Sequence, residues 1–196
     1  MVVLGASALW AQAQAPLAAV KDSIAQTVAI LHNTQLPVDE RRRQLHELAA
    51  LNLDLARMAQ ESMGNHWYQI EPSQRDEFVK LFDAFLEAAY LERIQDYANL
   101  HIDVSSEKLV DADHAQVTAT VTEPGEEPTP IVFVMEKRDP HWIVYDVLVD
   151  NVSMMGNYRA QFDRVIRDRG FDQLMETLQA KQARLAALLS EPTGTQ

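Results

Sequence analysis

The chain has 196 residues, 47% of them hydrophobic and 23% charged, and it contains no cysteine, which excludes disulfide bonds, thiolate catalysis and cysteine metal ligands. Carboxylates outnumber basic side chains 29 to 17, which gives a formal net charge of −12. This balance argues against a nucleic-acid partner, because affinity for a phosphate backbone comes from Lys and Arg side chains.

The first residues have the composition of a secretory signal. A short apolar run at residues 2–10 is followed by Ala11-Gln12-Ala13 and the overlapping Ala13-Gln14-Ala15, the small-x-small pattern that signal peptidase accepts. The run is too short to span a bilayer. We therefore expect residues 1–15 to be the remnant of a signal peptide, with a buried helix of a cytosolic protein as the alternative.

Helical periodicity dominates the first half of the chain. Apolar residues recur every three or four positions, which predicts amphipathic helices over residues 16–33, 40–51, 52–64 and 73–97. Asp39 is placed as an N-cap of the second helix, and Gly64 as the C-cap of the third.

The period then changes to two. Strands are predicted at residues 101–105, 115–122, 131–137 and 142–149, and the short connections between them permit only antiparallel neighbours. Helical spacing returns at residues 154–169 and 171–189. The order predicts an α+β fold in one domain, residues 16–190, with a helical part (16–98), a β-meander (99–150), a second helical part (151–190) and a polar tail (191–196).

Residues suited to catalysis are sparse. Asp146 and Asp150 share one face of the fourth strand and are candidates for acid–base work or a metal site. In the structural alternative, Asp150 ends the strand and Asp146 caps a helix or pairs with an arginine such as Arg159. The six histidines lack metal-ligand spacing, and neither a nucleophile motif nor a glycine-rich phosphate loop occurs.

A larger set of apolar side chains comes from the helix at 73–97 and from the strand-to-helix junction at 142–162. They form either a close-packed core or the lining of a cavity for an apolar ligand, and the adjacent methionines would suit an adaptable lining. The set consists of Trp67, Phe78, Phe82, Phe85, Tyr90, Val147, Val149, Val152, Met154, Met155, Tyr158 and Phe162.

Three groups of residues resemble the MlaC family, the periplasmic phospholipid-binding components of toluene-tolerance-type ABC transport systems. The resemblance covers residues 16–181. It is carried by Trp67 with Pro72-x-Gln74-Arg75-x-Glu77-Phe78, Phe82, Leu86 and Tyr90, by Trp142-x-Val144-Tyr145-Asp146-Val147-x-Val149-Asp150-x-Val152-Ser153, and by Asn157-Tyr158-Arg159-x-Gln161-Phe162 with Gly170-Phe171-Asp172. The family usually has glycine at position 151, and Asn151 also tolerates a positive φ.

The resemblance implies helices packed on a curved antiparallel sheet of about four strands, with an apolar cavity between them. The apolar set above, together with Val132 and Val134, would bind the acyl chains of a phospholipid carried as cargo. No catalysis, cofactor or metal is implied. Similar proteins shuttle lipid through the periplasm between an outer-membrane lipoprotein complex and an inner-membrane Mla ABC transporter, which maintains outer-membrane lipid asymmetry. The alternative is an envelope enzyme that acts on a small hydrophobic substrate with Asp146 as acid or base.

Overall fold

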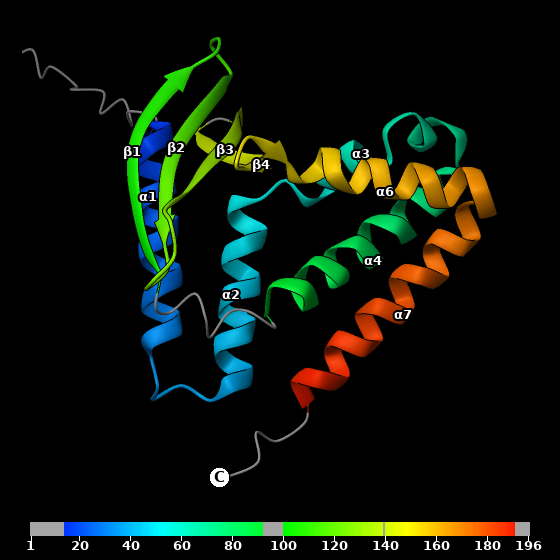
Figure 1. The fold of residues 1–196 in the computed structure, drawn as a ribbon, viewed down its shortest axis with the longest axis horizontal. Helices are drawn as coiled ribbons and strands as arrows, with labels where there is room; N and C mark the ends of the chain where they lie inside the picture. The colour runs from blue at the N-terminus through cyan, green and yellow to red at the C-terminus, as the bar shows by residue number, and fades with distance from the viewer. Residues whose placement is uncertain (1–13, 92–99, 139, 191–196) are drawn as a thin grey trace, which may run out of the picture.

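Helices, an antiparallel sheet and further helices follow one another along the chain (Figure 1). The computed structural model describes residues 14–91, 100–138 and 140–190. The elements are α1 (Pro16–His32), α2 (Val38–Asn52), α3 (Leu55–Met63), the 3-10 helix η1 (Gly64–Gln69), α4 (Pro72–Leu91), β1 (His101–Leu109), β2 (His114–Thr122), β3 (Thr129–Arg138), β4 (His141–Val149), β5 (Val152–Ser153), α6 (Met154–Arg169) and α7 (Phe171–Ser190).

The predicted α+β fold is confirmed, with differences at the ends of elements. The N-cap prediction for Asp39 is wrong, because α2 begins at Val38 after Pro37. Asp39 lies in the first turn of α2, where its negative charge interacts favourably with the positive end of the helix dipole. Gly64 ends α3 with φ +54°, as predicted. The part of the predicted fourth helix beyond Leu91 and the predicted signal remnant up to residue 13 lie outside the described residues.

The sheet is a meander in the order β1-β2-β3-β4-β5, with every neighbouring pair antiparallel. A two-residue turn joins β4 to β5 and uses positive φ at both Asp150 (49°) and Asn151 (62°). Asn and Asp adopt this conformation more readily than other non-glycine residues. The turn brings Ser153 directly to the start of α6.

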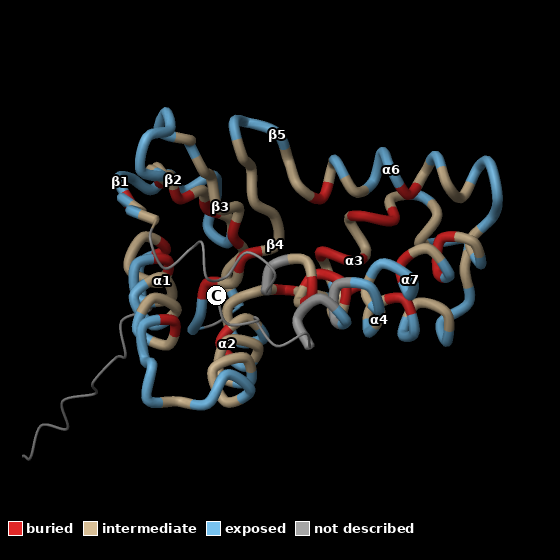
Figure 2. Tube along the Cα trace, turned by 60° about the horizontal axis from the view of Figure 1, so that its bottom comes forward, coloured by how far each residue is buried: buried red, intermediate tan, exposed pale blue. Residues whose placement is uncertain are grey.

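Most of the buried apolar side chains in the described ranges belong to two clusters, and Figure 2 shows buried residues both around the sheet and among the helices at the other end. The sheet cluster joins α1 to the strands and contains the buried residues Val20, Val104, Ala115, Val117, Ala119, Met135, Trp142 and Val144. The helical cluster joins α3, α4, α6 and α7 and contains Met58, Ala59, Met63, Phe78, Phe82, Phe85, Leu86, Met155, Phe162, Leu174, Met175 and Leu178. Leu53, the residue that follows α2, packs against both clusters.

Backbone hydrogen bonds join the α2–α3 junction to β4 at Leu53 and Asp54. Leu53 forms a parallel bridge with Val144, and the Asp54 N–H donates to the Val144 carbonyl at 2.8 Å. The buried Asp54 carboxylate accepts from the Arg57 N–H at 3.0 Å and forms an ion pair with Arg138. These bonds fix the point at which the two clusters meet.

Across the described ranges, no helix is both long and apolar enough to cross a bilayer.

Candidate functional site

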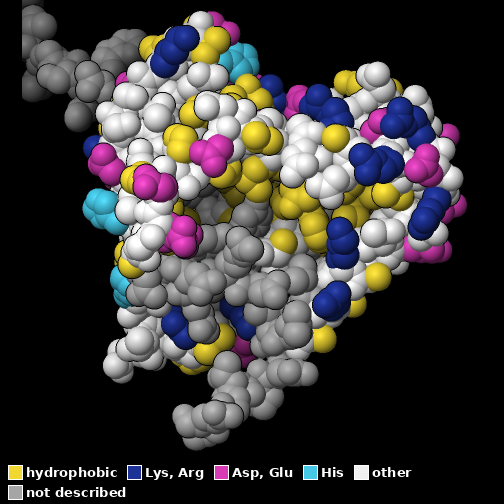
Figure 3. Space-filling view, viewed as in Figure 1, with side chains coloured by type: hydrophobic (Ala, Val, Ile, Leu, Met, Phe, Trp, Pro, Cys, Tyr) yellow, Lys and Arg dark blue, Asp and Glu magenta, His cyan; other side chains and the backbone are white. Residues whose placement is uncertain are grey.

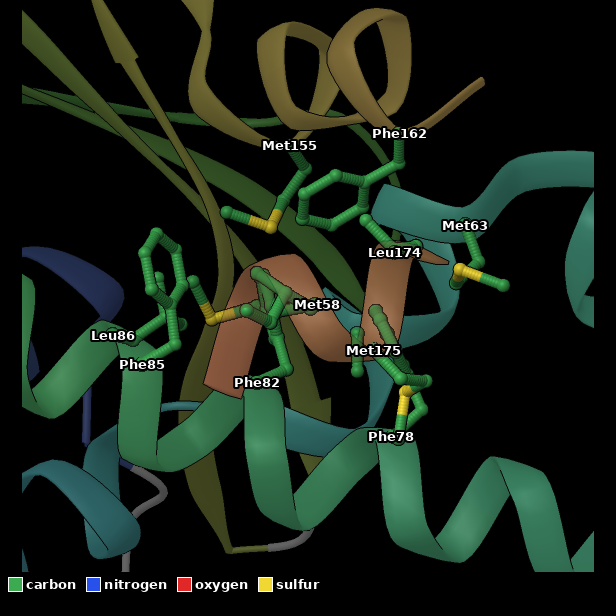
Figure 4. Close-up of a cluster of buried hydrophobic side chains, with 12 residues drawn as sticks. Met58, Met63, Phe78, Phe82, Phe85, Leu86, Met155, Phe162, Leu174 and Met175 are labelled. Atoms are coloured by element: carbon green, nitrogen blue, oxygen red, sulfur yellow. The ribbon is translucent and has the colours of Figure 1, made fainter. Parts of the chain in front are cut away.

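Three phenylalanines of α4 form the centre of the helical cluster. Phe78, Phe82 and Phe85 are spaced by four and three residues, so one face of the helix carries all of them. Figure 4 shows these rings directed towards Met155 and Phe162. The ring centroids of Phe82 and Phe162 are 6.0 Å apart in an edge-to-face arrangement, a favoured geometry for aromatic pairs.

Tyr158 of α6 extends this aromatic packing. Its ring centroid lies 5.7 Å from that of Phe82 and 5.7 Å from that of Phe85, both edge-to-face. Burial raises the pKa of the Tyr158 phenol above its usual value, so the side chain stays neutral over the physiological range. Tyr158 therefore adds a neutral ring to an apolar interior.

The structure brings most of the helical residues of the predicted lining together. Phe78, Phe82, Phe85, Met155 and Phe162 are buried in the helical cluster, and Trp67, Met154 and Tyr158 pack against it. Tyr90 lies in α4, but its side chain is outside the described part of the chain.

The valines of the predicted lining are divided between the two faces of the sheet. Val147 packs against the sheet cluster and pairs with Phe133. Val132 pairs with Leu148 and Val134 with Asp146, which places both on the opposite face, because successive residues of a strand point to opposite sides. Val132 and Val134 therefore face the opposite side of the sheet from Val147.

Two further valines lie near the end of β4. Val149 pairs with Ile131 on the same face as Val147, but it belongs to neither cluster. Val152 in β5 is 60% exposed, because it directly follows the two-residue turn at the edge of the sheet. The structure does not bring Val152 to the interior.

A small apolar cavity of about 70 Å³, partly open to solvent, lies between α1, the end of α2 and the sheet. Four residues of α1 line it, Ala19, Val20, Ser23 and Ile24, together with Asn52 and Leu53. From the sheet come Phe133, Met135, Trp142 and Val144. Of these ten residues, the predicted site contained none.

The signal for this cavity is present in the sequence but is indirect. Ala19 and Ser23 are one helical turn apart and share a face with neighbouring apolar residues. From the sheet, the larger side chains of Phe133, Met135 and Trp142 line the cavity. The small side chains of Ala19 and Ser23 do not fill the space that these larger neighbours leave between α1 and the sheet.

Apolar side chains also gather on the surface beside this interior. Figure 3 shows them in the middle of one face, between the sheet and the helices α6 and α7, whereas Lys and Arg side chains gather over the helical end.

Asp146 holds the strand-to-helix junction together. Its carboxylate accepts from the Ser153 hydroxyl at 2.5 Å, from the Met155 N–H at 3.1 Å and from the N–H of its neighbour Val147 at 2.9 Å. The Ser153 hydroxyl oxygen in turn accepts from the Gly156 N–H and caps α6. Asp146 therefore has a structural role: it helps Ser153 to cap α6, as in the structural alternative given above.

The other residues considered for acid–base chemistry or metal binding also have structural roles. Arg159, the suggested partner of Asp146, instead donates to the Glu61 carboxylate at 2.7 Å. Asp150 occupies the turn. Among the residues that the structure describes, no three His, Asp or Glu side chains are arranged to hold a metal ion.

Comparison with known proteins shows which proteins this chain is similar to. The sequence profile of the family described as MlaC protein matches residues 21–180. The intermembrane phospholipid transport system binding protein MlaC of Haemophilus influenzae is 26% identical over 136 residues, which are 67% of this chain and 63% of that protein. The chain thus spans less than two thirds of the length of this relative.

A solved structure has the same fold. The phospholipid-binding protein from Ralstonia solanacearum, determined in complex with a phospholipid, matches with a TM-score of 0.76 and 24% sequence identity. The match covers 87% of this chain and 98% of that one.

Proposed function

Because the chain belongs to the MlaC family, we propose that it binds a phospholipid and carries it as cargo through the periplasm. Both relatives named above are phospholipid-binding or phospholipid-transport proteins by name. The observation that carries the proposal is the divided interior, in which the sheet cluster and the helical cluster meet at Leu53 beside an apolar cavity.

The acyl chains would enter between the two clusters. The cavity of about 70 Å³ is about half the size of the cavities of roughly 150 Å³ that hold benzene, so a whole acyl chain requires the clusters to separate. Each methylene that leaves water contributes about 0.8 kcal/mol, which offsets the cost of separating the apolar side chains of the two clusters. Both clusters contain adaptable methionine side chains: Met135 lies in the sheet cluster, Met155 lies in the helical cluster, and Met154 packs against the helical cluster.

Release of the cargo would depend on partner proteins. Two buried acyl chains at about 0.8 kcal/mol per methylene give an affinity so high that unassisted dissociation is slow. We propose that an outer-membrane lipoprotein complex and an inner-membrane Mla ABC transporter complex load and unload the protein, which thereby maintains the lipid asymmetry of the outer membrane.

We propose no catalytic role for Asp146. Its carboxylate accepts hydrogen bonds from three donors of the strand-to-helix junction, which is a structural role.

Phospholipid content tests the proposed lining. Val147→Trp places a bulky ring against the sheet cluster and is expected to reduce the phospholipid that copurifies with the protein. Val152→Trp is the matched control, because the same substitution at a 60% exposed residue leaves the interior unchanged. Equal phospholipid content in Val147→Trp and the control would count against Val147 as part of the lining.

A further inference from the structure

The face of α1 that meets the sheet contains small side chains at the cavity. Ala19 and Ser23 line it one helical turn apart, and the buried Val20 beside them packs into the sheet cluster. Larger residues at these two positions would fill the space. The size of the cavity is therefore set from the α1 side by Ala19 and Ser23.

Bulky side chains limit the cavity on the sheet side. Phe133 and Met135 of β3 and Trp142 of β4 line it, and Met135 and Trp142 are buried. Phe133 is half-buried and packs against the cluster without being enclosed by it. Of these three residues, Phe133 can be shortened with the least disturbance of the core.

The lining suits a hydrocarbon and not a headgroup. No charged side chain is among the residues that line the cavity, and the amide of Asn52 donates to the Leu48 carbonyl at 2.7 Å. A phosphate or an ammonium group would lose its hydration there and find no charged partner, with the Ser23 hydroxyl and the Asn52 amide as the polar side-chain groups of the lining. Leu53 connects the cavity to the helical cluster, so a chain that lies between the clusters can reach it.

We propose that this cavity receives the methyl end of one acyl chain, so that Ala19, Ser23 and Phe133 determine the chain length of the bound phospholipid. The inference rests on the phospholipid binding proposed above. Because the cavity has about half the volume of one that holds benzene, it accommodates about three carbon atoms of a chain. Changes in its volume should therefore shift the preferred length by about two or three carbons.

Two substitutions with opposite effects test this. Ala19→Leu fills the cavity, and Phe133→Leu enlarges it. Ala29→Leu is the matched control, because it makes the same change at an exposed position of α1. Each purified variant is exchanged against a mixture of phosphatidylethanolamines with saturated chains of increasing length. The bound species are then quantified by mass spectrometry, and circular dichroism verifies the fold.

We expect Ala19→Leu to shift the bound species to shorter chains and Phe133→Leu to longer ones, while Ala29→Leu matches the wild type. If all the proteins bind phospholipid with one length distribution, the inference is overturned and the proposed function stands. If the wild type binds none of the mixture, both are overturned. Should Ala19→Leu fail to fold, an unchanged distribution in Phe133→Leu is sufficient to reject the inference.

Discussion

Replacement of Asp146 by alanine should destabilise the protein by removing one of the two side chains that accept hydrogen bonds at the start of α6, the other being Ser153. The Ser153 hydroxyl and the N–H of the buried Met155 lose a charged acceptor, and the start of α6 loses a negative charge. A hydrogen bond to a charged group contributes about 1.5–3 kcal/mol, and a charge at a helix terminus about 0.3–1 kcal/mol. Because Asp146 is half-buried and water can replace part of what is lost, we expect a total of about 2–4 kcal/mol.

Asp146→Asn is the conservative counterpart. The amide oxygen can still accept from the Val147 and Met155 N–H groups, so the expected loss is about 1 kcal/mol, mainly from the missing charge. Urea unfolding followed by circular dichroism measures both free energies of unfolding.

The same variants separate a carrier from an enzyme. Asp146→Asn should retain its copurifying phospholipid, whereas an enzyme with Asp146 as acid or base would lose its activity on a small hydrophobic substrate. Wild-type stability in Asp146→Ala would refute the capping role. Turnover of such a substrate by the wild type, abolished in Asp146→Asn, would refute the assignment of Asp146 to structure.

Two further substitutions test the joint between the clusters and an ion pair of α6. Leu53→Ala should lower the free energy of unfolding by about 2 kcal/mol, because Leu53 packs against both clusters. Leu51→Ala is the control: its position is 74% exposed, so its free energy of unfolding should stay within about 0.5 kcal/mol of the wild type. Equal losses of the two variants in urea unfolding would contradict this. A hydrogen bond from His66, at 3.0 Å, holds the pKa of the Asp163 carboxyl below its usual value, with a smaller contribution from the charge of Arg167. A lowered pKa stabilises the fold fully above about pH 4 and less as the pH falls through the folded-state value. Asp163→Asn should therefore be less stable than the wild type at neutral pH and approach it in acid; a stability difference independent of pH would contradict this.

The sequence predicted the elements well wherever one face is buried and the other exposed. The four-and-three spacing of the α4 phenylalanines correctly indicated a buried face, and α6 supplied Met155 and Phe162 to it. By contrast, β1 extends four residues beyond its predicted end at Ser105. Its second half is exposed throughout, so no apolar alternation marks it as a strand.

The division of the valines could not be predicted in the same way. Residues 131–134 are apolar without interruption, and such a run does not show which residues face the core. The pairing of β3 with β4 determines which of these residues face the core, and that pairing includes an irregularity next to Val134. The cavity at α1 depends on the distance between α1 and the sheet, which tertiary packing sets and no local pattern contains.

The phospholipid content of the purified wild-type protein is the most direct test of phospholipid binding. A solvent extract of protein secreted to the periplasm is analysed by mass spectrometry, and its phospholipid is compared with the amount of protein. We expect the extract to contain phospholipid in a fixed stoichiometric ratio to the protein. An extract without phospholipid, from protein that is folded by circular dichroism and still binds none after incubation with phospholipid vesicles, would contradict it.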